Sequence, residues 1–273
     1  MMFKSTVSFA LFALVILVLA TGGSASNDEI DDVDQLLEQA NFLTKVASKS
    51  TGSVHQTVEA VDTQVETVDL VLEKALREKD DGFVDDLMDH AHYLNEVAYV
   101  QIEGADKGIE VIDKIVKDSH DRVEYAIVMV EELLDDDSNN KKLKRALKKL
   151  EDADDAIEAA DDAVGDAENK IETAGGKIED AGIEIQESIN NGNDHDDIET
   201  ADEAVEEAEE AVEKADVYVE AADHAIKYAN RLIRQANTAV DNVGKGGKGG
   251  GMGMGMGRRA LRNKDGRRPG SKY

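Results

Sequence analysis

Three residues with metal-binding side chains, Asp89, His92 and Glu96, are spaced three and four positions apart. On an α-helix this spacing places them on one face, where carboxylates and an imidazole could hold a zinc ion. The chain has 60 Asp and Glu residues, however, so such a spacing is expected to arise by coincidence. His224 falls on the outward face of its predicted helix and His195 in a polar turn. The sequence therefore predicts no specific zinc site.

Two acidic turns raise the question of calcium binding. Asp135, Asp137 and Asn139 repeat the first alternating ligands of an EF-hand loop, but Asn140 stands at the position of its glycine and Ala146 at that of its bidentate glutamate. No tight calcium site is therefore expected. The density of carboxylates instead predicts either weak, diffuse calcium binding or a surface that only keeps the protein soluble. The residues chosen to represent the diffuse site are Asp135, Asp136, Asp137, Asp194, Asp196 and Asp197.

Sequence signatures of catalysis and of cofactor binding are missing. The 273 residues contain no nucleophile elbow, no phosphate-binding loop and no dinucleotide-binding fingerprint, which would need its glycine pattern between a predicted strand and a helix. We therefore expect a protein that is not an enzyme, with no cofactor other than weakly held calcium.

The elements that must carry these side chains are long helices, because apolar residues recur every seven positions. In the second half of the chain, each large aliphatic residue of the series is followed three positions later by alanine, except that Ser188 follows Ile185 and Val243 follows Val240. A strict seven-residue repeat forms one apolar seam along a helix and favours left-handed supercoiling against a neighbour. The series consists of Leu143, Leu150, Ile157, Val164, Ile171, Ile178 and Ile185, then Ile198, Val205, Val212, Val219, Ile226, Ile233 and Val240.

The same period, less regular, extends through the first half and divides the chain into four helical segments. Turn-forming residues interrupt it three times, and the predicted helices cover 29–79, 83–134, 141–189 and 197–243. Three apolar positions per heptad suit a helix with two neighbours, and short connections make successive helices antiparallel. The expected fold is all-α: long, coiled-coil-like helices in a four-helix bundle, in hairpins, or in an oligomeric coil of equal width.

Polar residues interrupt the seam at a few positions. Ser48–Ser53 is the weakest stretch of the first segment and the expected place for a kink. Asn95 and Ser119 also occupy seam positions, and we interpret them as tolerated polar residues rather than as determinants of register.

The first 25 residues have the pattern of a secretory signal peptide. Lys4 precedes an apolar run over 7–20, and small residues follow at 22–26. That run is short for a membrane span, and no other stretch is apolar enough. The mature protein is therefore predicted to be secreted and extracellular, with an acidic helical domain over 26–243. It has no cysteine, so helix packing must replace disulfides.

Charge is divided sharply between the body and a Gly- and Met-rich tail over 244–273. The tail carries +8 and the chain −29, which leaves −37 for residues 1–243. The acidic body argues against nucleic acid as a partner, because phosphates would be repelled. The tail is expected to be disordered and to contact acidic polymers, mineral surfaces, other matrix proteins or neighbouring copies. Its predicted contact residues are Lys245, Lys248, Arg258, Arg259, Arg262, Arg267 and Arg268, among which the two Arg-Arg pairs also allow proteolytic processing.

The tail ends in Arg267-Arg268-Pro-Gly-Ser-Lys-Tyr273, and in this it resembles secreted mollusc shell-matrix proteins. It is similar to the basic, tyrosine-ended tail of the glycine-rich shematrin group, which implies a role in a mineralised extracellular matrix. The resemblance covers only residues 244–273, and the body departs from that group, which lacks long heptad helices. The alanine-rich seams are similar to those of coiled-coil silk proteins, which implies fibre formation.

Three functions remain open on the sequence alone. The first is a secreted, non-enzymatic structural protein of a mineralised matrix, with a cation-binding acidic rod and a cross-linking basic tail. The second is a fibre-forming, silk-like coiled coil, for which fibrils formed without calcium would be the evidence. The third is an amphipathic lipid carrier, which the small Ala and Val seams with acidic flanks disfavour because such faces bind membranes poorly.

Overall fold

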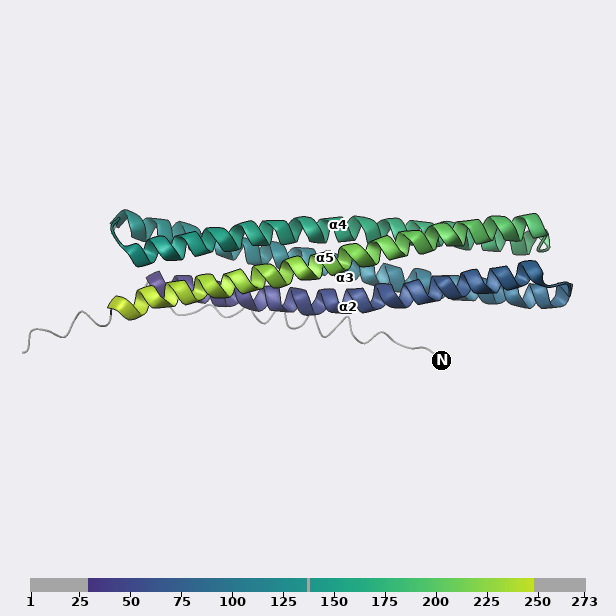
Figure 1. The fold of residues 1–273 in the computed structure, drawn as a ribbon, viewed down its shortest axis with the longest axis horizontal. Helices are drawn as coiled ribbons and strands as arrows, with labels where there is room; N and C mark the ends of the chain where they lie inside the picture. The colour runs from purple at the N-terminus through teal and green to yellow at the C-terminus, as the bar shows by residue number, and fades with distance from the viewer. Residues whose placement is uncertain (1–28, 137, 248–273) are drawn as a thin grey trace, which may run out of the picture.

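A computed structural model describes residues 29–136 and 138–247 of the chain. Within them lie four helices, α2 (Glu29–Arg77), α3 (Asp81–Asp136), α4 (Lys141–Asn191) and α5 (His195–Gly247). They run up and down beside one another as one long bundle (Figure 1). α2 and α4 each pack against both α3 and α5, so every helix has two neighbours. This confirms the predicted all-α fold in its four-helix, antiparallel form.

The helices begin and end within four residues of the expected positions. The largest difference is at the end of α5, which continues past Val243 to Gly247. Val243 packs against the core, and the extra turn supplies helical N–H partners to the last carbonyl groups of the apolar seam. The predicted signal peptide, residues 1–25, and the predicted tail after Gly247 lie outside the described residues.

The core is a narrow seam of aliphatic and alanine side chains that follows the whole length of the bundle. The heptad series of α4 and α5 is buried throughout; Ile157 and Ile226, for example, are 0% exposed. Each buried alanine removes little apolar area from water, and hydrophobic stabilisation scales with that area. Stability therefore accumulates over many heptads, which explains why the helices are long.

Polar residues at seam positions connect neighbouring helices. The side-chain amide of Asn95 in α3 donates to the carbonyl oxygen of Ile178 in α4 over 2.9 Å, and the hydroxyl of Ser119 donates to that of Ala40 in α2 over 3.3 Å. A Cβ on Gly182 would lie 2.7 Å from the Asn95 amide nitrogen, so glycine leaves room for the first bond. Asn95 and Ser119 are therefore more than tolerated: each has a partner across a helix interface, as a buried polar group requires.

α2 runs without a break through Ser48–Ser53, where a kink is predicted. Thr44 and Thr51 donate their hydroxyl groups to carbonyl oxygens four residues earlier, over 3.0 and 2.9 Å. Ser48 donates instead to Asp223 of α5 over 3.1 Å. These hydroxyls have partners that leave the helical backbone bonds in place, so the stretch stays helical.

The turns are closed by polar caps. Asp80 accepts two backbone N–H groups from the start of α3, and Asn140 accepts two from the start of α4. Asn140 thus caps a helix at the position where a calcium loop would need glycine. α4 ends at Asn191 and is capped by Gly192, whose φ of 90° favours glycine. The next residue, Asn193, donates to Asp85 of α3 over 2.6 Å.

Candidate functional site

The predicted diffuse carboxylates lie at opposite ends of the rod. Asp135 and Asp136 are the last residues of α3, whereas Asp194 precedes α5 and Asp196 and Asp197 belong to its first turn. The turns before α4 and before α5 are at opposite ends of the bundle (Figure 1). Asp137 is outside the described residues. The chosen residues therefore do not form one cation site.

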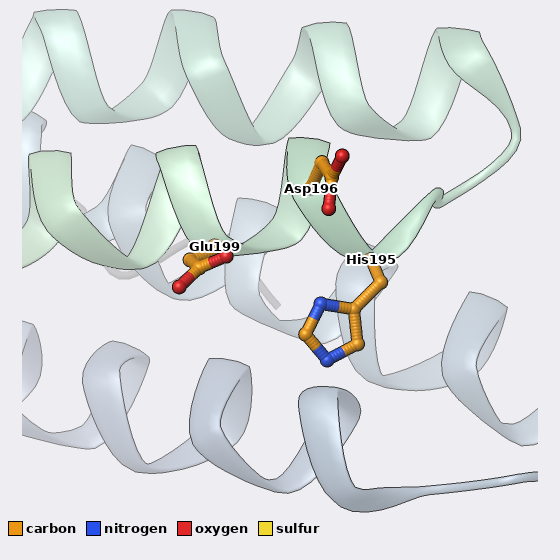
Figure 2. Close-up of side chains that lie close together, drawn as sticks. All are labelled: His195, Asp196 and Glu199. Atoms are coloured by element: carbon orange, nitrogen blue, oxygen red, sulfur yellow. The ribbon is translucent and has the colours of Figure 1, made fainter.

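One group of metal-type ligands comes together at the start of α5. Figure 2 shows His195, Asp196 and Glu199, whose ligand atoms lie within 4.8 Å of one another. All three side chains are exposed and come from the same helix end. Water competes fully for a cation at such a place, so a cation is expected to bind there only weakly. Glu199 was not among the predicted residues, although its spacing of four from His195 is the signal that could have found it.

The spacing of Asp89, His92 and Glu96 produces an ion pair rather than a three-ligand group. His92 Nε2 lies 3.7 Å from Glu96 Oε1 within α3. Asp89 does not join these two atoms in any three-ligand group found in the described part of the chain.

Carboxylates crowd together where α2 meets α5. The side chains of Asp69 in α2 and Asp202 in α5 lie beside each other, so that either one, when protonated, can donate a hydrogen bond to the other. Burial, followed by the nearby charges of Asp69 and Glu206, raises the pKa of Asp202 to about 6. Burial first, and Glu73 next, also raise the pKa of Asp69. The pair therefore holds a proton at pH values where an exposed aspartate has lost its own.

Similar crowding continues along the rod and recurs where α3 meets α4. In each case burial is the largest cause of a raised pKa. We define the α2–α5 row as Asp62, Asp69, Asp202, Glu209 and Asp216, and the α3–α4 row as Asp106, Asp154, Asp161 and Glu168. Because the ionised form of these groups is disfavoured, they bind a proton more readily than exposed carboxylates do.

One histidine bridges the helices within each row. His55 Nδ1 lies 2.8 Å from Asp216 Oδ1, and His120 Nε2 lies 3.1 Å from Asp154 Oδ1. In both aspartates burial raises the pKa, and the adjacent imidazole partly offsets this. The sequence predictions missed both pairs. The sequence signal for both pairs is the heptad position of the histidine. His55 directly follows Val54 and His120 directly follows Ser119, which occupy the same seam position, so each histidine lies beside a neighbouring helix.

A groove that the sequence predictions did not include lies between the start of α4 and the end of α5. Lys149 pairs with Asp152, whereas Arg145, Lys148 and Arg234 form no ion pair with any residue that the structure describes. The signal in the sequence is a run of nine residues at the start of α4 with six cationic side chains and no acidic one. We call this site, of about 650 Å³, the basic groove; its charged lining is Arg145, Lys148, Lys149, Arg231 and Arg234.

The predicted contacts of the tail are mostly beyond the described residues. Lys245 lies in the last turn of α5, at the same end of the rod as the basic groove. The others, Lys248, Arg258, Arg259, Arg262, Arg267 and Arg268, follow Gly247.

Comparisons with family models, with curated proteins and with solved structures give no match to this chain. Among the described helices, none is long and apolar enough to cross a membrane.

Replacing Asp202 with asparagine is expected to stabilise the bundle at pH 7.5 and to change its stability little at pH 4. The pKa of about 6 exceeds the ordinary 3.8, so the wild-type protein loses stability as the pH rises through this window. Asparagine resembles the protonated form and does not titrate. We expect a gain of about 1–2 kcal/mol at pH 7.5, after allowance for solvent screening, in urea unfolding followed by circular dichroism.

The matched control is Asp89→Asn, which removes the same charge from an exposed position of α3. It should change the free energy of unfolding little at either pH. An equal gain in both variants, or a gain from Asp202→Asn that does not depend on pH, would show that crowding between α2 and α5 is not the cause.

Proposed function

We propose that this chain is a secreted, non-enzymatic structural protein of a mineralised extracellular matrix. Its helical body is an acidic rod that accumulates calcium weakly along its length, and its basic tail cross-links the rod to acidic polymers, mineral or other matrix proteins. The observation that supports this best is the crowding of carboxylates along both the α2–α5 row and the α3–α4 row. Burial and repulsion between neighbouring carboxylates disfavour their ionised form.

Calcium suits such rows better than a single deep site. It accepts six to eight oxygen ligands in flexible geometry, and carboxylates are its usual ligands. At Asp69 and Asp202 a calcium ion placed between the helices would replace the proton and remove the repulsion between the two groups. Because the rows are open to water, binding is expected to be weak and spread over many groups.

The basic tail completes the proposal from the sequence. Its +8 charge contrasts with the −37 of the preceding residues, so it is attracted to acidic surfaces, including other rods. If the chain lacking residues 248–273 adsorbed to calcium carbonate and assembled as the complete chain does, the cross-linking role would be wrong.

A fibre-forming protein is the second candidate. Large apolar side chains point outward along the rod, among them Leu70, Val100 and Val217, which are 57%, 66% and 63% exposed. Exposed apolar groups on a long rod favour lateral contacts with other rods. Fibrils that grow with protein concentration in the absence of calcium would favour this function over the first.

Calcium titration tests the cation-binding part of the first proposal. Calcium at about 1–10 mM, the range of weak extracellular sites, should raise the free energy of unfolding by about 1 kcal/mol per occupied site. Sodium chloride at equal ionic strength is the control for screening. The double variant D69N/D202N should lose part of the calcium effect. No stabilisation by calcium beyond that of the sodium control would overturn this part of the proposal.

A further inference from the structure

Two grooves between α4 and α5, one toward each end of the rod, carry opposite charge. Toward the tail-bearing end lies the basic groove described above. Toward the other end the same two helices form a groove of about 320 Å³, whose lining includes a single cation, Lys177. We call this second site the acidic groove; its carboxylates are Asp180, Glu184, Glu203 and Glu207.

Two contacts between α4 and α5 show which of their residues lie at the same level. Lys142 donates to the carbonyl oxygen of Asn242 over 2.9 Å, and Lys177 donates to the Glu207 carboxylate over 2.6 Å. Moving 35 residues forward along α4 thus corresponds to moving 35 residues back along α5. On this scale Gly165 of α4 is level with Val219 of α5, near the middle of the rod; we call this the midpoint level.

In α5 the charges that line the basic and acidic grooves are placed symmetrically about the midpoint level. Arg231 and Arg234 follow Val219 by 12 and 15 residues, and Glu207 and Glu203 precede it by 12 and 16. At 1.5 Å per residue, each charged pair is about 20 Å from the midpoint.

In α4 the charges that line the two grooves, apart from Lys177, have the same symmetry about the same level. Lys148 and Arg145 precede Gly165 by 17 and 20 residues, and Asp180 and Glu184 follow it by 15 and 19. Each of the two helices, considered alone, therefore gives the same centre of symmetry on the rod.

We propose that two copies of this chain pair side by side and antiparallel through the α4/α5 face, about a two-fold axis at the midpoint level. Such an axis places α5 against α5 and α4 against α4, so that Arg231 faces Glu207 and Arg145 faces Glu184 of the second copy. Both copies use the same surface, and each basic groove meets an acidic groove. Val217, 63% exposed and two residues from the midpoint of α5, supplies an apolar contact near the axis.

The charge of −29 on each chain does not prevent this pairing. At about 0.15 M salt the Debye length is about 8 Å, so charges that face each other across the interface dominate over those on the far sides of the rods. The pairing is therefore electrostatic and weak, and high salt dissociates it. It requires neither the tail nor calcium, and so it goes beyond the proposed function.

Charge reversal tests the pairing in the mature chain, residues 26–273, by sedimentation velocity over about 1–300 µM protein. The wild-type protein should form dimers in 0.15 M NaCl that dissociate in 1 M NaCl. R231E/R234E and E203R/E207R should each raise the dissociation constant at least tenfold, and the four changes combined should restore pairing. The matched control K107E/K114E makes the same charge change at exposed positions of α3 and should pair as the wild type does.

Distance measurement tests the antiparallel arrangement. The chain has no cysteine, so single cysteines can carry spin labels. Asp166 is exposed beside the midpoint level, and labels on D166C in two facing helices should lie within about 25 Å. Asn139 is 26 residues from Gly165, so labels on N139C should be about 80 Å apart in an antiparallel pair. Short distances for both variants indicate a parallel pair and overturn the proposal.

Other results overturn the proposal in distinguishable ways. A chain that stays monomeric over the whole concentration range has no such interface. If a sulfated oligosaccharide binds that monomer and R231E/R234E abolishes the binding, the basic groove belongs to a polyanion. If R258Q/R259Q/R267Q/R268Q abolishes dimers while the groove reversals do not, the tail joins the copies and the cross-linking function stands without the pairing.

Discussion

Replacing Ile157 with alanine is expected to lower the free energy of unfolding by about 3 kcal/mol. The side chain is 0% exposed in the seam of α4, so its removal loses the transfer free energy of the deleted groups and leaves a cavity. The core is a narrow seam bounded by four helix backbones, which leaves little room to relax around that cavity. Urea unfolding followed by circular dichroism at 222 nm measures the loss.

The control for this prediction lies in the same helix. Ile183 is 50% exposed, and Ile183→Ala should cost less than about 0.5 kcal/mol, as is usual for a surface position. Equal costs for the two substitutions would mean that the seam through Ile157 is not the core of the folded protein.

Changing Asn95 to aspartate should have an effect of similar size at pH 7. Asn95 is 3% exposed and donates a hydrogen bond to the carbonyl oxygen of Ile178. A carboxylate cannot donate this bond and would bring a buried charge next to a carbonyl oxygen. We expect a loss of about 3 kcal/mol or more in the free energy of unfolding.

The pH dependence identifies the charge as the cause. Burial raises the pKa of an introduced aspartate, so the cost of Asn95→Asp should be small while the group is protonated and should grow as the pH rises. Asn169→Asp makes the same chemical change at an exposed position of α4 and should cost less than about 1 kcal/mol. A loss for Asn95→Asp that is the same at pH 4 and pH 7.5 would contradict the assignment.

The features that the sequence predicts correctly are those set by one helix at a time. The spacing of Ile157, Ile178 and Ile226 fixes which face each helix buries, whichever helix lies opposite. The polar turns end the helices close to the predicted residues because their caps, such as Asn140, act on the adjacent backbone. These local causes give the four-helix bundle.

The features that the sequence does not predict depend on which helices become neighbours. A position beside the seam of α2 faces α5 in this bundle but would face α3 in a bundle that turned the other way. The pair of His55 with Asp216, and that of Asp69 with Asp202, therefore cannot be predicted from the heptad pattern. The basic groove can be predicted only in part. The cations at the start of α4 are visible in the sequence, but Arg231 and Arg234 join them only because α4 and α5 pack antiparallel, with the end of α5 beside the start of α4.

An even number of antiparallel helices places Glu29 and Gly247 at the same end of the rod (Figure 1). One rod is thus monovalent, because every residue after Gly247 starts from that single end. An antiparallel pair is bivalent, with its two attachment points separated by roughly one rod length, about 75 Å for fifty helical residues. If the proposed pair forms and the tails bind surfaces as proposed, a surface with anchor points at that spacing would bind the pair with an avidity that neither tail has alone, whereas a surface with closer anchor points would engage one tail at a time.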